Sequence, residues 1–454
     1  MTTFVLKTVD ADGIGRDFLY NNMASVLREI STNTKIMPRV TEEKVTPTRP
    51  VMVTWKKSRK ISVLKIQLGL SCNYSCEYCL QRFVPFEQDT SARDVEAFMA
   101  SLERNVTLAP NARIQFWGGE PLVYWKTMFP LARALRAKYP EAQFSVITNG
   151  SLLDFEKALF LLELGFDVAI SHDGPGQSIR GADPFEDPLT RQAILMLYQR
   201  LQPLGKMSFN AMIHKNNQSR AAVQEFFQKL TNDPDVPIGE GGFIDAYDEG
   251  GMMHTTMTAQ EHVEFRRQAF DEISNGRALN FVSVGQKIMD FFETLDTGRS
   301  GYHVWQKCGM DKEDRIAVTL KGDVLTCQNV STTAVAANGA SHHVGNIERM
   351  EEVKIETSSH WLGRENCRSC PVLQLCKGSC MYLQGDLWDA SCAASYSDNV
   401  VLLAVAVKEL TGCTLKTIEP LGDKLPDYRR NVFDDAPKNE THLRKIIPIT
   451  LEKK

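Results

Sequence analysis

Apolar and polar residues alternate along residues 61–250 in a way that predicts strands and helices in turn. Short apolar runs predict five buried strands and a weaker sixth, at residues 63–70, 114–117, 144–148, 168–171, 209–213 and 242–247. Amphipathic stretches between them predict five helices, at residues 92–105, 124–138, 155–164, 189–201 and 220–230. Repeated strand–helix units favour an α/β fold with a parallel sheet and right-handed crossovers. The periodicity alone does not decide whether the sheet closes as a barrel.

The rest of the chain has other patterns on both sides of this body. We expect an N-terminal strand/helix extension over residues 1–60, with a strand at 4–9, a helix at 16–30 and a proline-containing linker. A helical bridge over 251–305 includes a helix at 257–275 with Thr258 as its N-cap.

A cysteine-rich region over 306–415 follows the bridge. It contains a predicted β-hairpin at 315–326, which turns at Lys321-Gly322-Asp323, and a closing helix at 399–410. Its cysteine-dense loops have little apolar periodicity, so metal clusters are the obvious means of holding them together. The last part, residues 416–454, is a charged and proline-containing tail that we expect to wrap the surface or fray.

The overall composition places the protein among soluble globular chains. It has 454 residues, with 52 Lys+Arg against 56 Asp+Glu, a net charge of -4 and 43% hydrophobic residues. This balance gives no reason to expect nucleic acid or an anionic membrane as a partner. The N-terminus lacks a signal-peptide pattern, and the longest apolar run, residues 400–407, is shorter than the ~20 residues that span a bilayer. We therefore expect a cytoplasmic protein.

Eleven cysteines are distributed unevenly along this chain. Three lie in the stretch LGLSCNYSCEYC and the other eight between Cys308 and Cys413. In a reducing compartment, clustered cysteines more often bind metal than form disulfides.

The first three, Cys72, Cys76 and Cys79, follow the first predicted strand of the body, on the face where parallel α/β proteins place ligands. Three thiolates on a four-iron cluster leave one iron open for a cofactor or substrate. The alternatives are three structural cysteines, or zinc with a distant fourth ligand.

This spacing, with Tyr78 just before the last cysteine, resembles the radical S-adenosylmethionine (SAM) superfamily. The resemblance covers roughly residues 62–247 and implies a partial (β/α)6 TIM-like barrel. It also implies a [4Fe-4S] cluster whose open iron is chelated by SAM. In that family the reduced cluster cleaves SAM to a 5′-deoxyadenosyl radical, which abstracts a substrate hydrogen.

Further turns after the predicted strands fit the same family. Gly118, Gly119 and Glu120 are similar to its GGE element, which meets the SAM amino group. Asn149 ends the third strand, and Ser171 and Asp173 end the fourth, where family members surround the SAM ribose and methionine carboxylate. The resemblance therefore implies that these residues and Tyr78 bind the cofactor, although each motif alone is an ordinary turn.

Seven of the downstream cysteines, with a Gly-Asn-Ile stretch at 345–347, resemble the SPASM extension of radical SAM enzymes that modify peptides and proteins. The resemblance implies two auxiliary clusters, and thus three [4Fe-4S] clusters in all. The outer one would be ligated by Cys367, Cys370, Cys376 and Cys392, and the inner one, nearer SAM, by Cys308, Cys327 and Cys380.

The inner cluster lacks an evident fourth cysteine. Asp314, a more distant side chain or nothing could complete it, while Cys413 is expected to pack as a small apolar residue. Zinc remains the structural alternative for the whole region.

One position bears on the substrate. Sulfatase-maturing family members have an aspartate base directly after the second SPASM cysteine, where this chain has Gln328. An amide cannot accept a proton near neutral pH, which disfavours formylglycine formation. Asp245 and Asp248 are alternative bases, although both also fit solvated loop carboxylates.

The resemblance thus favours a maturase that installs a crosslink or related modification in a ribosomally made peptide. Its partners would be a peptide or protein substrate, possibly with a separate leader-binding protein, and an electron donor such as flavodoxin or ferredoxin. Alternatives are a formylglycine-generating sulfatase maturase, a small-molecule radical SAM dehydrogenase and an iron–sulfur electron carrier.

Overall fold

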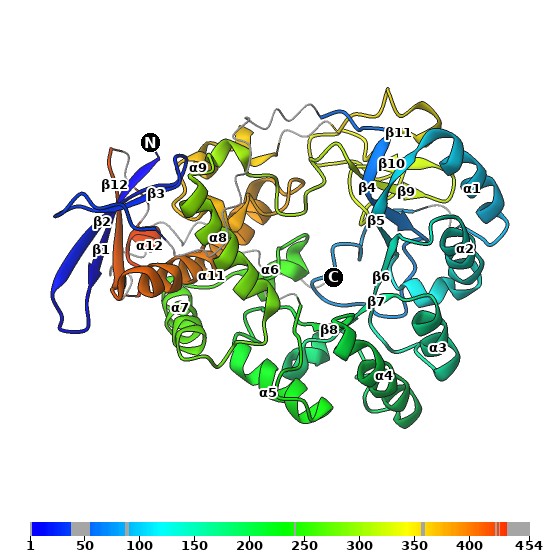
Figure 1. The fold of residues 1–454 in the computed structure, drawn as a ribbon, viewed down its shortest axis with the longest axis horizontal. Helices are drawn as coiled ribbons and strands as arrows, with labels where there is room; N and C mark the ends of the chain where they lie inside the picture. The colour runs from blue at the N-terminus through cyan, green and yellow to red at the C-terminus, as the bar shows by residue number, and fades with distance from the viewer. Residues whose placement is uncertain are drawn as a thin grey trace, which may run out of the picture.

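The computed structural model describes residues 2–37, 55–86, 90–239, 242–355, 359–422, 425 and 427–433. Its body is a parallel sheet whose five central strands follow one another in chain order: β4 (Lys60–Gln67), β5 (Thr107–Trp117), β6 (Gln143–Thr148), β7 (Asp167–Ser171) and β8 (Met207–Asn210). Each neighbouring pair is parallel. The parallel α/β body predicted from the sequence is confirmed (Figure 1).

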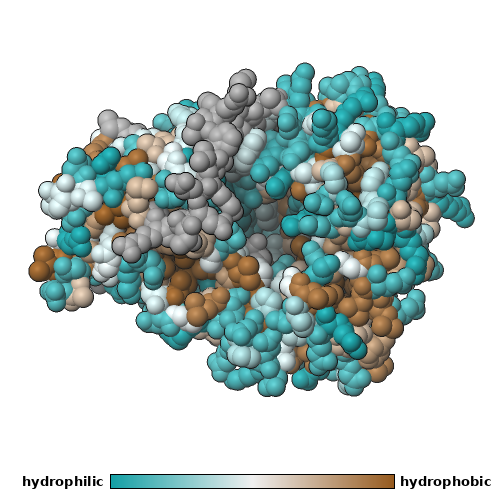
Figure 2. Space-filling model, viewed as in Figure 1, coloured by the Kyte–Doolittle hydropathy of each residue, from teal (hydrophilic) through white to brown (hydrophobic). Residues whose placement is uncertain are grey.

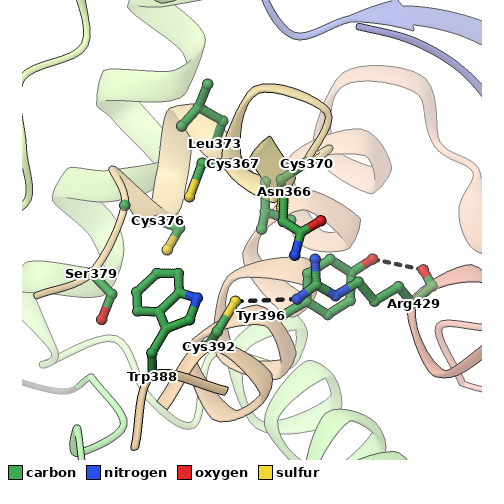
Figure 3. A pocket seen from close by; sticks show the side chains of 12 residues that line it. Asn366, Cys367, Cys370, Leu373, Cys376, Ser379, Trp388, Cys392, Tyr396 and Arg429 are labelled. Atoms are coloured by element: carbon green, nitrogen blue, oxygen red, sulfur yellow. Dashed lines mark hydrogen bonds between the residues drawn. The ribbon is translucent and has the colours of Figure 1, made fainter. Parts of the chain in front are cut away.

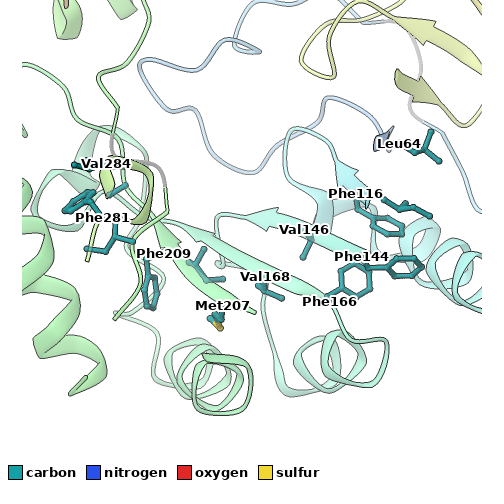
Figure 4. Packing of buried hydrophobic residues seen from close by; sticks show 14 of the residues in the cluster. Leu64, Phe116, Phe144, Val146, Phe166, Val168, Met207, Phe209, Phe281 and Val284 are labelled. Atoms are coloured by element: carbon teal, nitrogen blue, oxygen red, sulfur yellow. The ribbon is translucent and has the colours of Figure 1, made fainter. Parts of the chain in front are cut away.

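Each of these strands is followed by one of the five predicted helices: α1 (Asp94–Asn105), α2 (Trp125–Lys138), α3 (Phe155–Glu163), α4 (Pro188–Leu201) and α5 (Arg220–Thr231). They lie along the outer side of the sheet (Figure 1). Phe116, Phe144 and Phe166 pack against one another in the core (Figure 4). Alternate strand residues are therefore buried in this core, while the carboxyl ends of the strands stay available for a site.

The predicted sixth strand, at residues 242–247, is wrong. Only one isolated parallel bridge forms there, between Ile213 and Phe243. The backbone N–H of Ala246 donates to the Ser391 hydroxyl at 2.7 Å instead of to a strand. A side chain from a distant helix thus takes the hydrogen bond that a sheet partner would have made.

The predicted hairpin is confirmed, and it joins the body. Strands β9 (Arg315–Thr319) and β10 (Asp323–Leu325) are antiparallel, and β11 (His343–Asn346) pairs with β10. Strand β9 also pairs in parallel with β4, so the sheet continues from the body into the cysteine-rich region. In the order β11-β10-β9-β4-β5-β6-β7-β8, strand β10 lies one strand away from β4 and runs antiparallel to it.

Three helices lie in the region predicted as a helical bridge: α6 (Glu249–Thr255), α7 (Ala259–Ser274) and α8 (Val282–Thr297). The predicted cap of α7 is present, since the Thr258 hydroxyl accepts from the backbone N–H of Glu261 and the Glu261 carboxylate accepts from that of Thr258.

The N-terminal helix predicted at residues 16–30 is wrong. This segment forms β2 (Gly15–Asn21) and β3 (Val26–Glu29), which continue an antiparallel sheet from β1 (Thr3–Val9). Its apolar residues fit both a helical and an alternating pattern, and pairing with β1 decides between them by burying Phe18 and Tyr20. The strand in this strand/helix extension is confirmed, and the helix is not.

The C-terminal tail predicted at 416–454 is wrong at its start. Strand β12 (Thr414–Pro420) pairs with β1 at the other edge of the N-terminal sheet, and a short helix, α12 (Asp427–Arg430), follows. Chain regions more than 400 residues apart thus form one sheet, on the left in Figure 1. The linker at 38–54 and residues 434–454 lie outside the described residues.

The closing helix is much longer than the predicted 399–410. Helix α11 (Gly385–Thr411) begins fourteen residues earlier and carries Cys392, which we had expected in a loop. Buried hydrogen bonds hold its polar residues, including Ser397 with Arg266, and Asp398 with Arg220. The helix is long and apolar enough to cross a membrane, but 89% of its most apolar window is buried inside the protein. It is therefore a core helix.

Candidate functional site

The cysteine triad lies in the loop that follows β4, at the carboxyl end of the parallel sheet. Cys72 is exposed, whereas Cys76 and Cys79 are half-buried, and all eleven cysteines of the chain are free thiols. A tight turn joins the last two, because the N–H of Cys79 donates to the carbonyl of Cys76 at 3.0 Å. Burial raises the pKa of the Cys76 thiol to about 11, an effect that the nearby Arg180 cation opposes.

The Gly-Gly-Glu loop after β5 packs directly on this cysteine loop. The N–H of Gly119 donates to the carbonyl of Gly69 at 3.1 Å, and that of Glu120 to Ser71 at 3.0 Å. A Cβ at position 119 would lie 2.4 Å from the carbonyl oxygens of both Leu70 and Ser71. Only glycine permits this approach, so the two loops form one backbone cradle.

The Glu120 carboxylate is 1% exposed and accepts three hydrogen bonds. Its donors are the N–H of Leu122 at 2.9 Å, the Thr148 hydroxyl at 2.7 Å and the N–H of Asn149 at 2.7 Å. Burial raises its pKa, and these hydrogen bonds oppose the rise. Glu120 therefore fixes the end of β6 against the cradle. The sequence suggested only that its carboxylate meets the SAM amino group.

Asn149 links the same strand end to the cysteine loop. Its side-chain amide donates to the Asn73 carbonyl oxygen at 3.0 Å, and the Asn73 amide donates to Ser151 at 2.8 Å. Ser171 is the last residue of β7 and lies opposite Asn210 of β8. The sequence-predicted cofactor residues thus gather at neighbouring strand ends, as parallel pairing requires.

Tyr78 and Asp173 form a buried group with Arg180, a residue that the sequence did not single out. The Tyr78 hydroxyl donates to Asp173 Oδ2, and Arg180 Nη1 contacts both partners. The second oxygen of Asp173 accepts from the N–H of Met212 at 3.0 Å. This group ties the cysteine loop to the ends of β7 and β8, and Arg180 places a positive charge beside the thiols.

Two buried histidines border the triad and were also missed. The His254 imidazole lies 2.7 Å from the carboxylate of Glu77, while His214 packs near Tyr78 with ring centroids 6.2 Å apart. Burial lowers the pKa of His214 to about 4. Isolated histidines have no sequence pattern that could have revealed this proximity.

The four cysteines predicted for the outer auxiliary site line one pocket (Figure 3). Cys367 and Cys370 come from the turn around α9 (Glu365–Arg368), Cys376 ends α10 (Leu373–Cys376) and Cys392 lies on α11. Arg429 Nη2 donates to Cys392 Sγ at 3.1 Å. Burial raises the pKa of Cys370 to about 12, so cluster binding would have to displace its proton.

The three cysteines predicted for the inner site influence one another electrostatically. Burial raises the pKa of Cys380 to about 12, and charges on Asp245, Cys327 and Cys308 add to this rise. In the described part of the chain, no group of three or more His, Cys, Asp or Glu side chains could hold a single metal ion.

The loop after β10 reaches from the inner site to the strand ends of the candidate SAM site. Gln67 Nε2 donates to the carbonyls of Gln328 at 2.7 Å and Val330 at 2.8 Å. Gln328 Oε1 accepts from the buried Lys65 ammonium at 3.1 Å, and burial lowers the pKa of Lys65. Asn329 Oδ1 accepts from the indole of Trp117 at 2.7 Å. The amide side chain of Gln328 therefore occupies the position where sulfatase-maturing family members have an aspartate base.

The remaining candidate carboxylates have other contacts. Asp248 caps α6, and its Oδ1 accepts from the N–H of Gly251 at 2.6 Å. Asp245 Oδ1 accepts from Ser379 at 2.6 Å, next to Cys380. Asp314 lies at the start of β9, where its carboxylate accepts from the Ser62 hydroxyl.

Cys413 is fully buried in the hydrophobic core, just after the end of α11. The packing role expected for this cysteine is therefore confirmed.

Comparison with known proteins agrees with this geometry. Residues 66–215 match the family model "Radical SAM superfamily", a span that runs from β4 to just past β8 and contains the cysteine triad. A [4Fe-4S] cluster and SAM are therefore implied for the triad.

Two curated relatives match most of the chain. The cysteine-type anaerobic sulfatase-maturating enzyme of Clostridium perfringens is 23% identical over 377 residues, which cover 74% of this chain and 93% of the relative. The radical SAM cyclopropyl synthase TigE of Paramaledivibacter caminithermalis is 22% identical, over 71% of this chain and 68% of the relative. A solved structure described as native anSMEcpe with bound AdoMet and Cp18Cys peptide covers 76% of this chain and 99% of its own, at 19% identity and a TM-score of 0.54. That match shows a shared fold.

The parallel sheet, the cysteine triad and the family match together identify residues 66–215 as a radical SAM domain. More narrowly, the chain is similar to maturases of the sulfatase-maturating type over about three quarters of its length.

Proposed function

We propose that this chain is a radical SAM peptide maturase, which abstracts hydrogen from a ribosomally made peptide and installs a crosslink or related modification. The relatives that support this include a maturating enzyme and a cyclopropyl synthase. When bound, SAM and a reduced cluster supply a 5′-deoxyadenosyl radical to such a site.

The observation that carries the proposal is the environment of Gln328. This residue is 7% exposed, and its side-chain oxygen accepts from Lys65. The neighbouring Asn329 is held by Trp117 and by Gln81, which follows the cysteine triad by two residues. The loop thus closes on the triad without a carboxylate at its centre. An amide here argues against deprotonation of a substrate thiol or hydroxyl by this residue, and favours another outcome for the substrate radical.

The chain's own residues would hold and orient the cofactors. Cys72, Cys76 and Cys79 would ligate the catalytic cluster, and the seven SPASM cysteines two auxiliary ones. The cradle of Gly118 and Gly119 would approach SAM through its backbone. Tyr78, Asn149, Ser171 and Asp173 would complete the cofactor site, while the charge of Arg180 offsets the negative charge of the thiolates.

We further propose a cytoplasmic setting with three external partners. These are the precursor peptide, an electron donor such as flavodoxin or ferredoxin, and a separate protein that binds the peptide leader.

A sulfatase-type maturase that generates formylglycine is the second candidate, because the sulfatase-maturating enzyme covers 74% of this chain. In that case another base must replace the aspartate, and Asp245 beside Cys380 is a candidate.

The test uses the full chain, reconstituted without oxygen and supplied with SAM and dithionite. One sample receives the short peptide encoded beside the gene, and another a cysteine-containing sulfatase peptide. We expect 5′-deoxyadenosine and a changed mass only for the neighbouring peptide. Formylglycine in the sulfatase peptide would instead establish the second candidate.

Two cysteine variants provide matched controls. Cys72→Ala removes a triad ligand and should abolish both products, whereas Cys413→Ala alters a buried cysteine outside the cluster sites and should retain them. Turnover that survives Cys72→Ala would refute the assignment of the triad.

A further inference from the structure

Asp311 is a buried carboxylate, and one of its two oxygens has no hydrogen-bond partner among the described residues. The residue is 5% exposed and its side chain not at all. Oδ2 accepts from the N–H of Gln306 at 2.9 Å and lies 3.1 Å from Nε2 of His360. Oδ1 is also buried and has no hydrogen-bond partner in the described part of the chain. Buried polar atoms are nearly always hydrogen-bonded, so the unpaired Oδ1 is open to a further partner.

This carboxylate lies on the same tight loop as Cys308. The N–H of Gly309, which has a φ of 65°, donates to the carbonyl of Gln306 at 2.8 Å, and that of Lys312 donates to Gly309 at 3.2 Å. Cys308 and Asp311 are thus three residues apart around a turn, the spacing of the Cys-x2-Cys pairs that bind iron–sulfur clusters.

The loop is fastened to the segment that leads into Cys380. Gln306 Nε2 donates to the carbonyls of Gly378 at 2.9 Å and Ser379 at 2.7 Å. Gln306 therefore holds Asp311 through its backbone N–H and the approach to Cys380 through its side chain. Two of the three inner cysteines and Asp311 thus belong to one hydrogen-bonded unit.

The backbone around Asp311 is fixed from the other side by Lys57. Its ammonium donates to the carbonyl of Met310 at 2.6 Å and to that of Lys312 at 2.7 Å, the residues on either side of Asp311. The carboxylate is therefore held by both its backbone and its second oxygen, as ligating carboxylates usually are.

We propose that Asp311 is the fourth protein ligand of the inner auxiliary cluster, bound through Oδ1 and completing the set of Cys308, Cys327 and Cys380. The inference rests on the proposed function in so far as these cysteines hold a cluster. The sequence suggested Asp314 as a possible fourth ligand. Its carboxylate instead accepts a hydrogen bond from the hydroxyl of Ser62. The inner cluster is then closed by the protein, and its fourth iron is not a binding site for the substrate.

The test uses the full chain with Cys72, Cys76 and Cys79 replaced by alanine, so that only the auxiliary sites take up iron. Three versions are compared: Asp311 unchanged, Asp311→Ala and Asp311→Cys, with Asp314→Ala as the matched carboxylate control. Iron is counted, and isotopically labelled imidazole is offered to the reduced proteins as a probe of an open iron by pulsed electron paramagnetic resonance.

We expect about eight irons per chain with Asp311 or with Asp314→Ala, and no imidazole coupling in either. Asp311→Ala should bind imidazole or lose about one iron per chain. Asp311→Cys should keep both clusters, and the potential of one should fall, because a thiolate donates more electron density to iron than a carboxylate does.

Three results would each overturn the inference. Imidazole coupling of equal strength in the Asp311 and Asp311→Ala proteins, with about eight irons in each, would show an open fourth iron and refute the Asp311 ligand alone. A chain with Asp311 intact that takes up no iron would refute the auxiliary clusters themselves. Unchanged iron content, imidazole response and potentials in both Asp311 variants would also exclude ligation.

Discussion

Single residues decide whether the two loops of the candidate SAM site can meet. Gly119 is the clearest case, because a Cβ there would lie 2.4 Å from two backbone oxygens that belong to the cysteine loop. We predict that Gly119→Ala separates the loops, costs about 1–3 kcal/mol of stability and weakens SAM binding at least as strongly. Equilibrium binding of SAM and urea unfolding measure the two effects.

The matched control is Gly285→Ala. Gly285 lies in α8, and a Cβ there would meet nothing within 4 Å. This change should leave SAM binding intact and stabilise the helix by about 0.5–1 kcal/mol. Equal SAM binding by the wild type and Gly119→Ala would contradict the close approach of the two loops.

Arg429 provides a second prediction at this scale. Its guanidinium donates to Cys392 Sγ at 3.1 Å in the outer auxiliary site. Hydrogen bonds and positive charge at a ligand sulfur favour the reduced cluster, so Arg429→Met should lower the potential of one auxiliary cluster. Redox titration followed by electron paramagnetic resonance tests this. If the cluster potentials of Arg429→Met equal those of the wild type, Cys392 is not a ligand of the outer cluster.

The sequence makes definite predictions for residues that have a specific spacing. Roles are predicted for the cysteines because their separations are specific, and for the turn motifs because each follows a predicted strand. Arg180 and His214 could not, because they come near the triad only through the pairing of β7 with β8 and the loops beyond. The role of Glu120 was also hidden, since its three hydrogen-bond donors come from two different strand ends.

At the scale of elements, the contact between α7 and α11 contains a titratable group that links stability to pH. His262 is 3% exposed, and its Nδ1 lies 2.9 Å from the Ser397 hydroxyl, which also accepts from Arg266. Burial, and secondarily the charge of Arg266, lower the pKa of His262 to about 3.

Below its ordinary pKa of about 6.5, the unfolded chain binds a proton at this histidine, while the folded chain does not until about pH 3. This group therefore destabilises the fold as pH falls through that range. Between pH 7 and pH 5 its contribution is a loss of about 2 kcal/mol.

We predict that His262→Gln removes this part of the pH dependence. The measurement is the free energy of urea unfolding at pH 7 and pH 5, without oxygen. The exposed His343 provides the control variant His343→Gln, which should keep the wild-type loss. A His262→Gln protein with the full wild-type loss would contradict the buried neutral imidazole.

Helices with a regular spacing of apolar residues were predicted well. Elements whose conformation depends on pairing with distant parts of the chain were not. The five helices of the body and the cap of α7 follow from local pattern and capping chemistry. Residues 16–30 became β2 and β3 because β1 pairs with β2, and the start of α11 was missed because its serines and Asp398 are satisfied by distant arginines and backbone groups.

At the scale of the whole molecule, the parallel pairing of β9 with β4 organises the function. It attaches the cysteine-rich region to the first strand of the body, so the loop after β10 spans from Cys327 to the strand ends that carry the triad. Sequence spacing predicts three sites for the cysteines, but it could not place these predicted sites relative to one another. That arrangement depends on contacts between residues more than 200 positions apart.

The central claim is that the hydrogen abstracted at this site comes from a peptide. The most direct measurement supplies the reconstituted enzyme with SAM, dithionite and the neighbouring precursor peptide labelled throughout with deuterium at carbon, and examines the 5′-deoxyadenosine by mass spectrometry. The account predicts deuterium in the 5′-deoxyadenosine, accompanied by a matching mass change in the peptide. Unlabelled 5′-deoxyadenosine beside an unchanged peptide would contradict it.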